Sequence, residues 1–438
     1  MQNKYIINIV IANLLWSFIP ILVSDLVSQI SVFMIIFIRF TISGVFLLFI
    51  AIIFTFVNNY FTTNAKISLK LLIENIRHKN RRFNNIRNYN YYILIGFCGV
   101  ILNIIFFFLT LKNTSISFTM IGFLLSVIII AIYEAGRNFE KFDVFKVLYI
   151  TLMVFAILII LFVSYEAVRL GGELIYLNGF VYLILFSVSI SFLYIGINKD
   201  SYSKREITSI NENKYYKIPR FLIKMSFSFL IGTLLMIPFL MVLNFLPIFS
   251  DFRVEIILFF NEFPNIFLYM GQWEILYLII FSTIIPYLLV YLANVNWKSA
   301  NLTYSQWSSI LNLIDPMGSI ILSVIFVNEF FPFELMITFI FLILISIILR
   351  YAHEVKNMVN AFLLITLRKG VIGLLPVKLL KNYGIIAIHS LIGSHDLLIN
   401  IKISSIKDFY YLVDKKLKSI DDIKKVEIFF VNKMEKIT

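Results

Sequence analysis

The sequence predicts an all-α polytopic membrane bundle of about ten transmembrane helices, followed by a small α+β domain. Two observations predict this division. First, the 438 residues are 60% hydrophobic and only 14% charged, whereas soluble domains contain about 25% charged residues. Second, the long apolar runs stop after Arg350, and short segments of alternating apolar and polar residues replace them.

The membrane part contains ten apolar segments, and each could cross the hydrocarbon core, which takes roughly 20 helical residues. Further spans, rather than a small-residue cleavage site, follow the first segment, so we expect it to be retained and not to be a signal peptide. The segments lie near residues 5–23, 33–56, 91–111, 115–135, 145–164, 175–196, 221–246, 273–293, 303–327 and 334–351.

Basic residues lie on alternate connections between these segments. The connections 57–90, 136–144 and 197–220 are rich in Lys and Arg, and those on the other side hold only Lys112, Arg169 and Arg253. This asymmetry predicts a multi-pass cell-membrane protein with both termini in the cytoplasm. It also accounts for the net charge of +13, so we do not expect a nucleic-acid partner.

Two stretches of the membrane part match each other at a fixed offset, with Thr114 falling on Thr303 and Glu140 on Glu329. Each half contains five spans, an odd number, so the second half must insert upside down relative to the first. Inverted repeats place a substrate site near the midplane of the membrane, between the halves. We therefore expect one repeat at 1–164 and the other at 165–351.

Three motifs resemble the ten-helix EamA type of the drug/metabolite transporter superfamily: "ANLLWSFIPILVSDL" (12–26), "FIRFTISGVFLLFI" (37–50) and "SILNLIDPMGSIILSVIFVNE" (309–329). The resemblance covers roughly residues 5–351 and implies secondary transport of a small metabolite. One departure is that Val127 occupies the position that corresponds to Pro316, so the first half lacks the family's usual proline in its fourth helix.

Two charged residues stand well inside predicted spans, where charge is costly and often functional. Arg39 is about 9 Å from the outer end of its helix, and Asp315 is about 18 Å from the inner end of its own, at 1.5 Å per residue. In a core about 30 Å thick the two lie at similar depth and could pair. The alternatives are that Arg39 reaches the outer headgroups and that Asp315 is only a static partner of Arg39 or of a helix amide.

Asp315 directly precedes Pro316, and a proline inside a helix removes a backbone donor. We therefore expect this helix to bend at the wall of a cavity. Alternatively, each polar residue near it only joins helices together. The residues expected to line the substrate cavity are Asn13, Trp16, Arg39, Asn103, Trp307, Asn312, Asp315 and Pro316.

The tail is expected to consist of a linker at 352–360 and a domain at 361–438. Strands are predicted at 361–370, 385–393, 395–404 and 424–431 from their alternating pattern. Helices are predicted at 374–383 and after a capping-box-like start formed by Ser405 and Asp408. The order βαββαβ is that of the ferredoxin-like fold.

The tail resembles the ligand-sensing domain of leucine-responsive/AsnC regulators through "AFLLI", a Gly-x-x-Asp turn, "SIKDFYYLVDKKL" and "IKKVEIFF". The resemblance implies pairing through the sheet, hence a homodimer or higher homo-oligomer. It also implies an amino-acid effector bound at Gly393, His395 and Asp396. A transmembrane helix replaces the DNA-binding module of those regulators. The alternative is that the tail only dimerises.

The sequence contains no P-loop, no metal-ligand spacing and no nucleophile motif, so we expect neither an enzyme nor a cofactor or metal. A single cysteine, Cys98, cannot form a disulfide within the chain. The expected function is secondary transport, as export, of a small metabolite such as an amino acid or a relative. The alternatives are a membrane-anchored amino-acid receptor without transport activity and a lipid-handling scaffold or enzyme.

Overall fold

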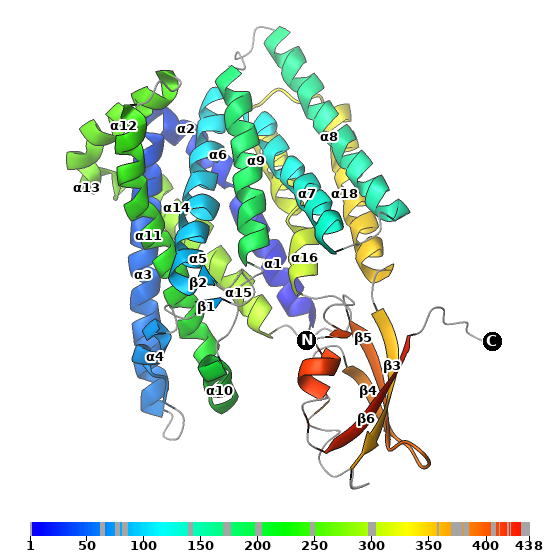
Figure 1. Ribbon diagram of the computed structural model, residues 1–438. Coiled ribbons are helices and arrows are strands. Elements are labelled where there is room, and N and C mark those ends of the chain that lie inside the picture. Colours follow the sequence, from blue (N-terminus) through cyan, green and yellow to red (C-terminus); the bar gives the residue numbers. More distant parts are fainter. Residues whose placement is uncertain are drawn as a thin grey trace.

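The computed structural model shows a bundle of long helices with a small sheet domain at one of its ends (Figure 1). We call the end at which the sheet domain and the N-terminus lie the tail end, and the opposite end, where α12 lies, the far end. The structure describes residues 2–61, 66–74, 79–80, 86–138, 143–169, 177–197, 204–245, 250–296, 304–356, 359–368, 379, 385–403, 409–410, 412–417, 420 and 422–430.

Ten helical segments of the described residues are long and apolar enough to span a membrane, as the sequence predicted. The first is interrupted at Phe18, which separates its two helices just before Pro20. The first five spans comprise α1 (Gln2–Ser17) with α2 (Ile19–Gln29), α3 (Val32–Phe61), α5 (Asn88–Leu94) with η2 (Ile95–Ile101) and α6 (Leu102–Asn113), α7 (Ile116–Asn138), and α8 (Val144–Arg169).

The second five spans contain a break at Asn312 and Leu313, where the sequence predicted a bend. They comprise α9 (Leu177–Ile197), α11 (Lys217–Asn244), α14 (Trp273–Ile279) with η5 (Ile280–Ile284) and α15 (Ile285–Asn296), α16 (Tyr304–Leu311) with α17 (Ile314–Phe326), and α18 (Phe333–Lys356).

Shorter elements lie between the spans. Near the tail end are α4 (Leu69–Glu74), β1 (Lys79–Asn80), β2 (Ile86–Arg87), α10 (Lys204–Glu212) and η3 (Lys214–Tyr216), and at the far end are α12 (Ser250–Glu262), η4 (Phe263–Asn265) and α13 (Ile266–Tyr269).

Two of the spans contain a π-helical segment, η2 and η5. Each lies in the third span of its five-span half, and each is flanked by ordinary α-helix. A π segment widens the helix locally and is frequently found at functional sites. The η2 segment packs closely on α11, because a Cβ on Gly96 would lie 2.2 Å from the carbonyl oxygen of Ser228.

The tail domain is a four-stranded antiparallel sheet in the order β4-β5-β3-β6. Its strands are β3 (Val359–Leu367), β4 (Ile385–Ser390), β5 (Leu397–Ile403) and β6 (Ile423–Phe430). This order and the sequence of elements agree with the predicted ferredoxin-like fold.

One face of the sheet carries the domain's own core. Leu363 pairs with Ile399 across the two central strands, and both side chains are fully buried. The segment η6 (Leu412–Leu417) supplies buried Leu412 and Val413 to the same core. Of the helix expected at 374–383 the structure describes only Leu379, which is also buried there. The expected cap of Ser405 and Asp408 lies outside the described residues.

The membrane helix continues farther than the sequence suggested. We expected a linker at 352–360, but α18 extends to Lys356 and β3 begins at Val359, which leaves only 357–358 between them. Polar residues in this last part of α18 find partners inside the protein. His353 Nδ1 lies 2.7 Å from Asp143 Oδ1, and the Arg350 guanidinium lies 5.9 Å from the ring centre of Tyr149.

Candidate functional site: a cavity inside the bundle

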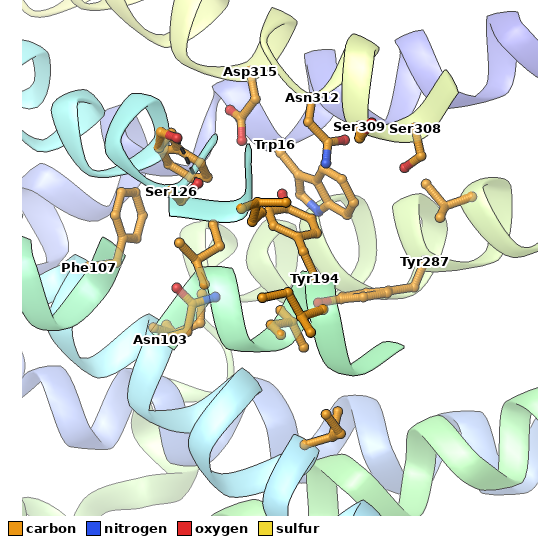
Figure 2. Close-up of a pocket in the computed structure, with 18 of the residues that line it drawn as sticks. Trp16, Asn103, Phe107, Ser126, Tyr194, Tyr287, Ser308, Ser309, Asn312 and Asp315 are labelled. Atoms are coloured by element: carbon orange, nitrogen blue, oxygen red, sulfur yellow. Dashed lines mark hydrogen bonds between the residues drawn. The ribbon is translucent and has the colours of Figure 1, made fainter. Parts of the chain in front are cut away.

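The bundle encloses a cavity of about 370 Å³. Its size falls near the lower end of the range for small-molecule sites, about 300–1,000 Å³. Figure 2 shows Asp315 and Asn312 on one side of this space and Asn103 on the other, with Trp16, Tyr194 and Tyr287 between them. The lining therefore comes from both five-span halves of the chain.

The two interrupted spans pack against each other at their breaks. Ser17 Oγ donates a hydrogen bond to the carbonyl oxygen of Asp315 at 3.1 Å, and Ser319 Oγ donates to that of Ser17 at 3.2 Å. Gly318 permits this approach, because a Cβ there would lie 2.5 Å from Ser17 Oγ. Ser17 and Asp315 are thus fixed side by side, with Trp16 adjacent along the chain.

Asp315 stands at the start of α17 and lines the cavity with only 7% of its surface exposed. Ser319 Oγ lies 3.4 Å from its Oδ1, a long and weak contact. Among the described residues, no Lys, Arg or His forms an ion pair with Asp315. A carboxylate in such a place is costly unless it binds a partner.

Arg39 lines the same cavity and is 2% exposed. Its Nε donates to Thr283 Oγ1 at 2.8 Å, and its Nη2 donates to the carbonyl oxygen of Ser282 at 3.3 Å. Both acceptors belong to the π segment η5, and the indole Nε1 of Trp16 donates to the same Ser282 oxygen at 3.0 Å. In the described structure Nη1 of Arg39 has no hydrogen-bond partner.

The possible pairing of Arg39 with Asp315 does not occur in the described structure. The guanidinium is turned toward η5, where hydroxyl and carbonyl oxygens accept its hydrogen bonds. Asp315 instead contacts Ser17 and Ser319. Similar depth in the bundle therefore did not bring the two charges into contact.

Five of the eight residues expected to line the cavity do so: Trp16, Arg39, Asn103, Asn312 and Asp315.

The other three lie outside the lining. Asn13 Nδ2 donates to the carbonyl oxygen of Ile9 within its own helix at 2.8 Å. Trp307 packs against Tyr351, with ring centres 5.6 Å apart. Pro316 is buried in the first turn of α17.

Several lining residues were not anticipated. Tyr194 and Tyr287 face the middle of the cavity (Figure 2), but the sequence contains 23 tyrosines and gives no reason to single these out. Lys224 was placed in an apolar segment near its end, where a lysine usually reaches the headgroups. It is instead 6% exposed, with its Nζ 5.2 Å from the ring centre of Tyr92.

Toward the tail end the lining becomes charged. Arg220 Nε donates to Glu206 Oε1 at 2.6 Å, and both side chains are buried. Gln306 Nε2 donates to Glu354 Oε2, also at 2.6 Å. The lining residues at this end are Arg220, Lys224, Tyr304, Gln306, Arg350 and Glu354. The cavity thus extends to the tail-side ends of α11, α16 and α18.

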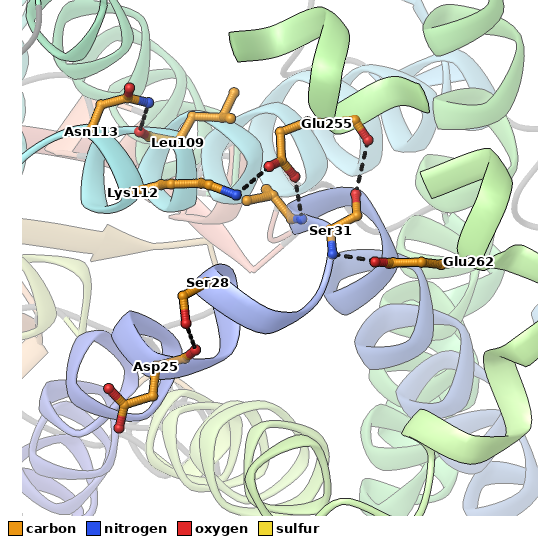
Figure 3. Close-up of polar contacts among 9 residues, drawn as sticks. Asp25, Ser28, Ser31, Leu109, Lys112, Asn113, Glu255 and Glu262 are labelled. Atoms are coloured by element: carbon orange, nitrogen blue, oxygen red, sulfur yellow. Dashed lines mark hydrogen bonds and ion pairs between the residues drawn. The ribbon is translucent and has the colours of Figure 1, made fainter. Parts of the chain in front are cut away.

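At the far end, polar contacts join the two halves of the bundle (Figure 3). Glu255 of α12 forms an ion pair with Lys112 of α6 and accepts a hydrogen bond from the backbone N–H of Val32 at 2.8 Å. Glu262 accepts from the N–H of Ser31 at 3.0 Å. Carboxylates at the N-terminus of α3 satisfy donors that the helix itself cannot bond.

A second contact between the halves adds to this far-end closure. Glu329 Oε1 accepts from the backbone N–H of Ser117, at the start of α7, at 2.9 Å. Glu140, its expected counterpart in the first half, lies outside the described residues.

Burial raises the pKa of Glu262, an effect that the Ser31 hydrogen bond and the Lys112 charge partly oppose.

The turn between β4 and β5 holds the three residues expected to bind an effector. Gly393 has a φ of 143°, which L side chains rarely adopt. Asp396 Oδ2 accepts a hydrogen bond from the N–H of Leu367 at 2.6 Å, and His395 Nδ1 lies 3.1 Å from Thr366 Oγ1. Asp396 therefore fastens the turn to β3.

Comparisons with known proteins agree with the sequence motifs. Residues 3–162 match the EamA-like transporter family, and residues 360–438 match the Lrp/AsnC ligand binding domain. No curated protein matches the chain. One solved structure, titled "Crystal structure of protein", is 13% identical with a TM-score of 0.45, over 80% of this chain and 96% of that chain. The two family matches confirm the resemblances drawn from the sequence.

Proposed function

We propose that this chain, which carries an EamA-like transporter domain and an Lrp/AsnC ligand binding domain, exports a small metabolite, an amino acid or a relative. The observation that supports transport most directly is the buried cavity between ten apolar spans, with Arg39 and Asp315 on its wall. Inverted-repeat carriers place their substrate in this position. The proposal includes no catalytic step, so the protein acts as a carrier and not as an enzyme.

The proposed orientation places both termini and the tail end in the cytoplasm, and the far end outside. The Lys and Arg residues of the connections at the tail end support it. The proposed division is one five-span repeat at 1–164, a second from 165 to the end of α18 at Lys356, and a sensor domain that begins with β3 at Val359. A cavity open toward the tail end would then receive its substrate from the cytoplasm, which suits an exporter.

We assign the tail a sensing role in which two copies pair through their sheets and hold an effector, an amino acid, near Gly393, His395 and Asp396. The sheet face opposite the core supports pairing, because Phe362 lies there beside Phe429, which is 50% exposed. The short connection between α18 and β3 would transmit a change in this pairing directly to the bundle. Export would then rise when the cytoplasmic pool of the substrate rises.

The test is a transport screen in proteoliposomes that hold the full chain, with radiolabelled amino acids and their close relatives. We expect transport of at least one compound at a rate well above that of empty liposomes. A chain that ends at Lys356 should transport the same compound with simple saturation kinetics, and should lack the additional activation that a high tail-side concentration produces in the full chain.

An inactive full chain would contradict the transport proposal if calorimetry showed that the same preparation binds an amino acid. That result would favour the alternative, an amino-acid receptor anchored in the membrane.

A further inference from the structure

Two of the buried charged residues on the cavity wall, Arg39 and Asp315, have opposite sign and do not pair with each other. Arg39 is 2% exposed and Asp315 is 7% exposed, and the described structure shows no ion pair for either. Arg39 still has one unused donor, Nη1, and the Asp315 carboxyl receives contacts only from the hydroxyl groups of Ser319 and Ser17 among the described residues. Uncompensated charges in the interior are unfavourable, so both groups are suited to a ligand that supplies the missing partners.

Both charged residues connect to one short piece of α1 through hydrogen bonds. Trp16 shares the Ser282 carbonyl oxygen with the Arg39 guanidinium. The next residue, Ser17, donates to the backbone of Asp315. Two successive residues of one helix therefore connect the cation to the anion, and a single small ligand could contact both.

The π segment η5 fixes the guanidinium so that one edge remains available. Thr283 Oγ1 accepts a hydrogen bond from Arg39 Nε and in turn donates one to the carbonyl oxygen of Leu278 at 2.8 Å. The carbonyl oxygen of Ser282 accepts a hydrogen bond from Arg39 Nη2. An anchored guanidinium loses little conformational freedom on binding a carboxylate, and such charge-assisted hydrogen bonds are strong.

On the α6, α7 and α9 side the lining is mainly apolar and aromatic. It includes Ile104, Phe107, Met120, Phe123, Phe186 and Ile190. These residues offer no charge to a ligand, but they can bury a large apolar group. Asn103, on the same side, has a side-chain oxygen without a hydrogen-bond partner in the described structure.

We infer that the cavity binds a zwitterionic α-amino acid with a large apolar side chain, through contact of its carboxylate with Arg39 Nη1 and of its ammonium group with Asp315. The side chain of the ligand then lies against Phe107 and Phe186 of the cavity lining. This inference rests on the proposed transport function and specifies which substrates that function takes.

A purely structural role for the two charges is the competing explanation. Arg39 would then serve only to hold η5, and Asp315 only to stabilise the break before α17. A structural role predicts that the charge of the ligand is irrelevant. The ligand series below separates the two explanations in the unaltered protein.

The experiment measures inhibition of transport in proteoliposomes that hold the full chain and import the best substrate from the screen. The competitors are L-leucine and L-phenylalanine, their amides, which lack the carboxylate, and 4-methylpentanoate and 3-phenylpropanoate, which lack the ammonium group. Hydrogen bonds to charged groups contribute enough that we expect at least one amino acid to inhibit about tenfold or more better than both of its analogues.

Two variants test which side chain contacts which charged group of the ligand. In Arg39→Met the amide should inhibit as well as the parent amino acid, and in Asp315→Asn the deaminated acid should do so. Arg39→Lys, which keeps the charge, should retain the preference for a carboxylate.

If the amide and the deaminated acid inhibit transport as strongly as the amino acid does, this inference is overturned and the transport proposal still stands. Absence of any transport would instead overturn the transport proposal itself. The analogue series needs only the unaltered chain, so a variant that fails to fold does not weaken the test.

Discussion

The two ends of the bundle hold their charged side chains in different ways. At the far end, Glu255, Glu262 and Glu329 of the second half bind backbone N–H groups and Lys112 of the first half. At the tail end, Arg220 pairs with Glu206 and Gln306 with Glu354, each pair within the second half. The cavity lining includes Arg220, Gln306 and Glu354 of this tail-end group and none of the four far-end side chains.

This difference indicates which end is closed. Bonds between the halves must break before the halves can separate, whereas bonds inside one half can persist during such a movement. The far end is therefore fastened by carboxylates. At the tail end the described links between the halves are the contact of His353 with Asp143 and the cation–ring contacts of Arg350 with Tyr149 and of Lys224 with Tyr92. We infer that the tail end opens more readily to a ligand. Alternation of access between two such ends is how inverted-repeat carriers work.

The largest effect is expected from breaking the buried pair at the tail end. Arg220→Met removes the guanidinium from the buried Glu206 carboxylate, and breaking a buried pair typically costs about 3–5 kcal/mol. Thermal unfolding of the purified protein in detergent should show a clear decrease in Tm.

Arg169→Met is the matched control, because Arg169 pairs with Glu166 at an exposed site at the far end. Exposed pairs contribute about 0–1 kcal/mol, so its Tm should hardly change. Equal decreases in the two variants would show that the buried tail-end pair does not stabilise the bundle.

The next effect concerns the fastening of the far end. Glu255→Gln removes the charge that binds Lys112 and weakens the bond from the Val32 N–H, at a cost of about 1.5–3 kcal/mol for a charged hydrogen bond. The far end should open more often. A cysteine introduced by Ser309→Cys in a Cys98→Ala chain should then react faster with an impermeant maleimide added at the far side.

Glu166→Gln is the control for this variant, since Glu166 lies at the same end in an exposed pair. Its labelling rate should equal that of the unaltered reporter chain. An unchanged rate in Glu255→Gln as well would remove Glu255 from the closure.

The smallest effect is a pH dependence of the far end. Burial raises the pKa of Glu262 above its ordinary value of 4.5, and Glu255, Lys112 and Tyr269 are the titratable groups near it. A raised pKa means that the closed form favours the protonated carboxyl. The contribution of Glu262 to the stability of the closed form is thus complete below pH 4.5, and it is lost as pH rises through the raised pKa.

Labelling of the Ser309→Cys reporter from the far side should therefore increase modestly over that pH window. Because Glu262→Gln is neutral at every pH, it should abolish the increase, once the rates are corrected for the reactivity of the thiolate. A pH profile in Glu262→Gln that is identical to that of the unaltered reporter chain would assign the dependence to another group.

The sequence predicted those features that depend on regular patterns. Apolar length defined the ten spans, and alternation along residues 397–403 defined a strand of the tail sheet. The break of the ninth span followed from Pro316, since a proline interrupts the helical hydrogen bonds. These features need only local information, which is why one sequence was sufficient.

Side-chain partners could not be predicted in the same way. Arg39 binds η5, which lies 244 positions later in the chain, and no local pattern indicates a π segment there. Glu255 and Glu262 lie in α12, outside the predicted spans, and the sequence alone gave no reason to connect them with Ser31. Asn13 and Trp307 were expected at the cavity from residue type alone, and their actual orientation depends on how neighbouring helices pack.

The most direct test of this account is the accessibility of the unaltered cavity from its two ends. It uses the Ser309→Cys reporter in the Cys98→Ala chain, in sealed vesicles whose tail side is identified by an affinity tag after Thr438. We predict that an impermeant maleimide labels the reporter rapidly when added on the tail side and hardly at all when added on the far side, without substrate. Faster labelling from the far side would contradict a cavity that opens at the tail end.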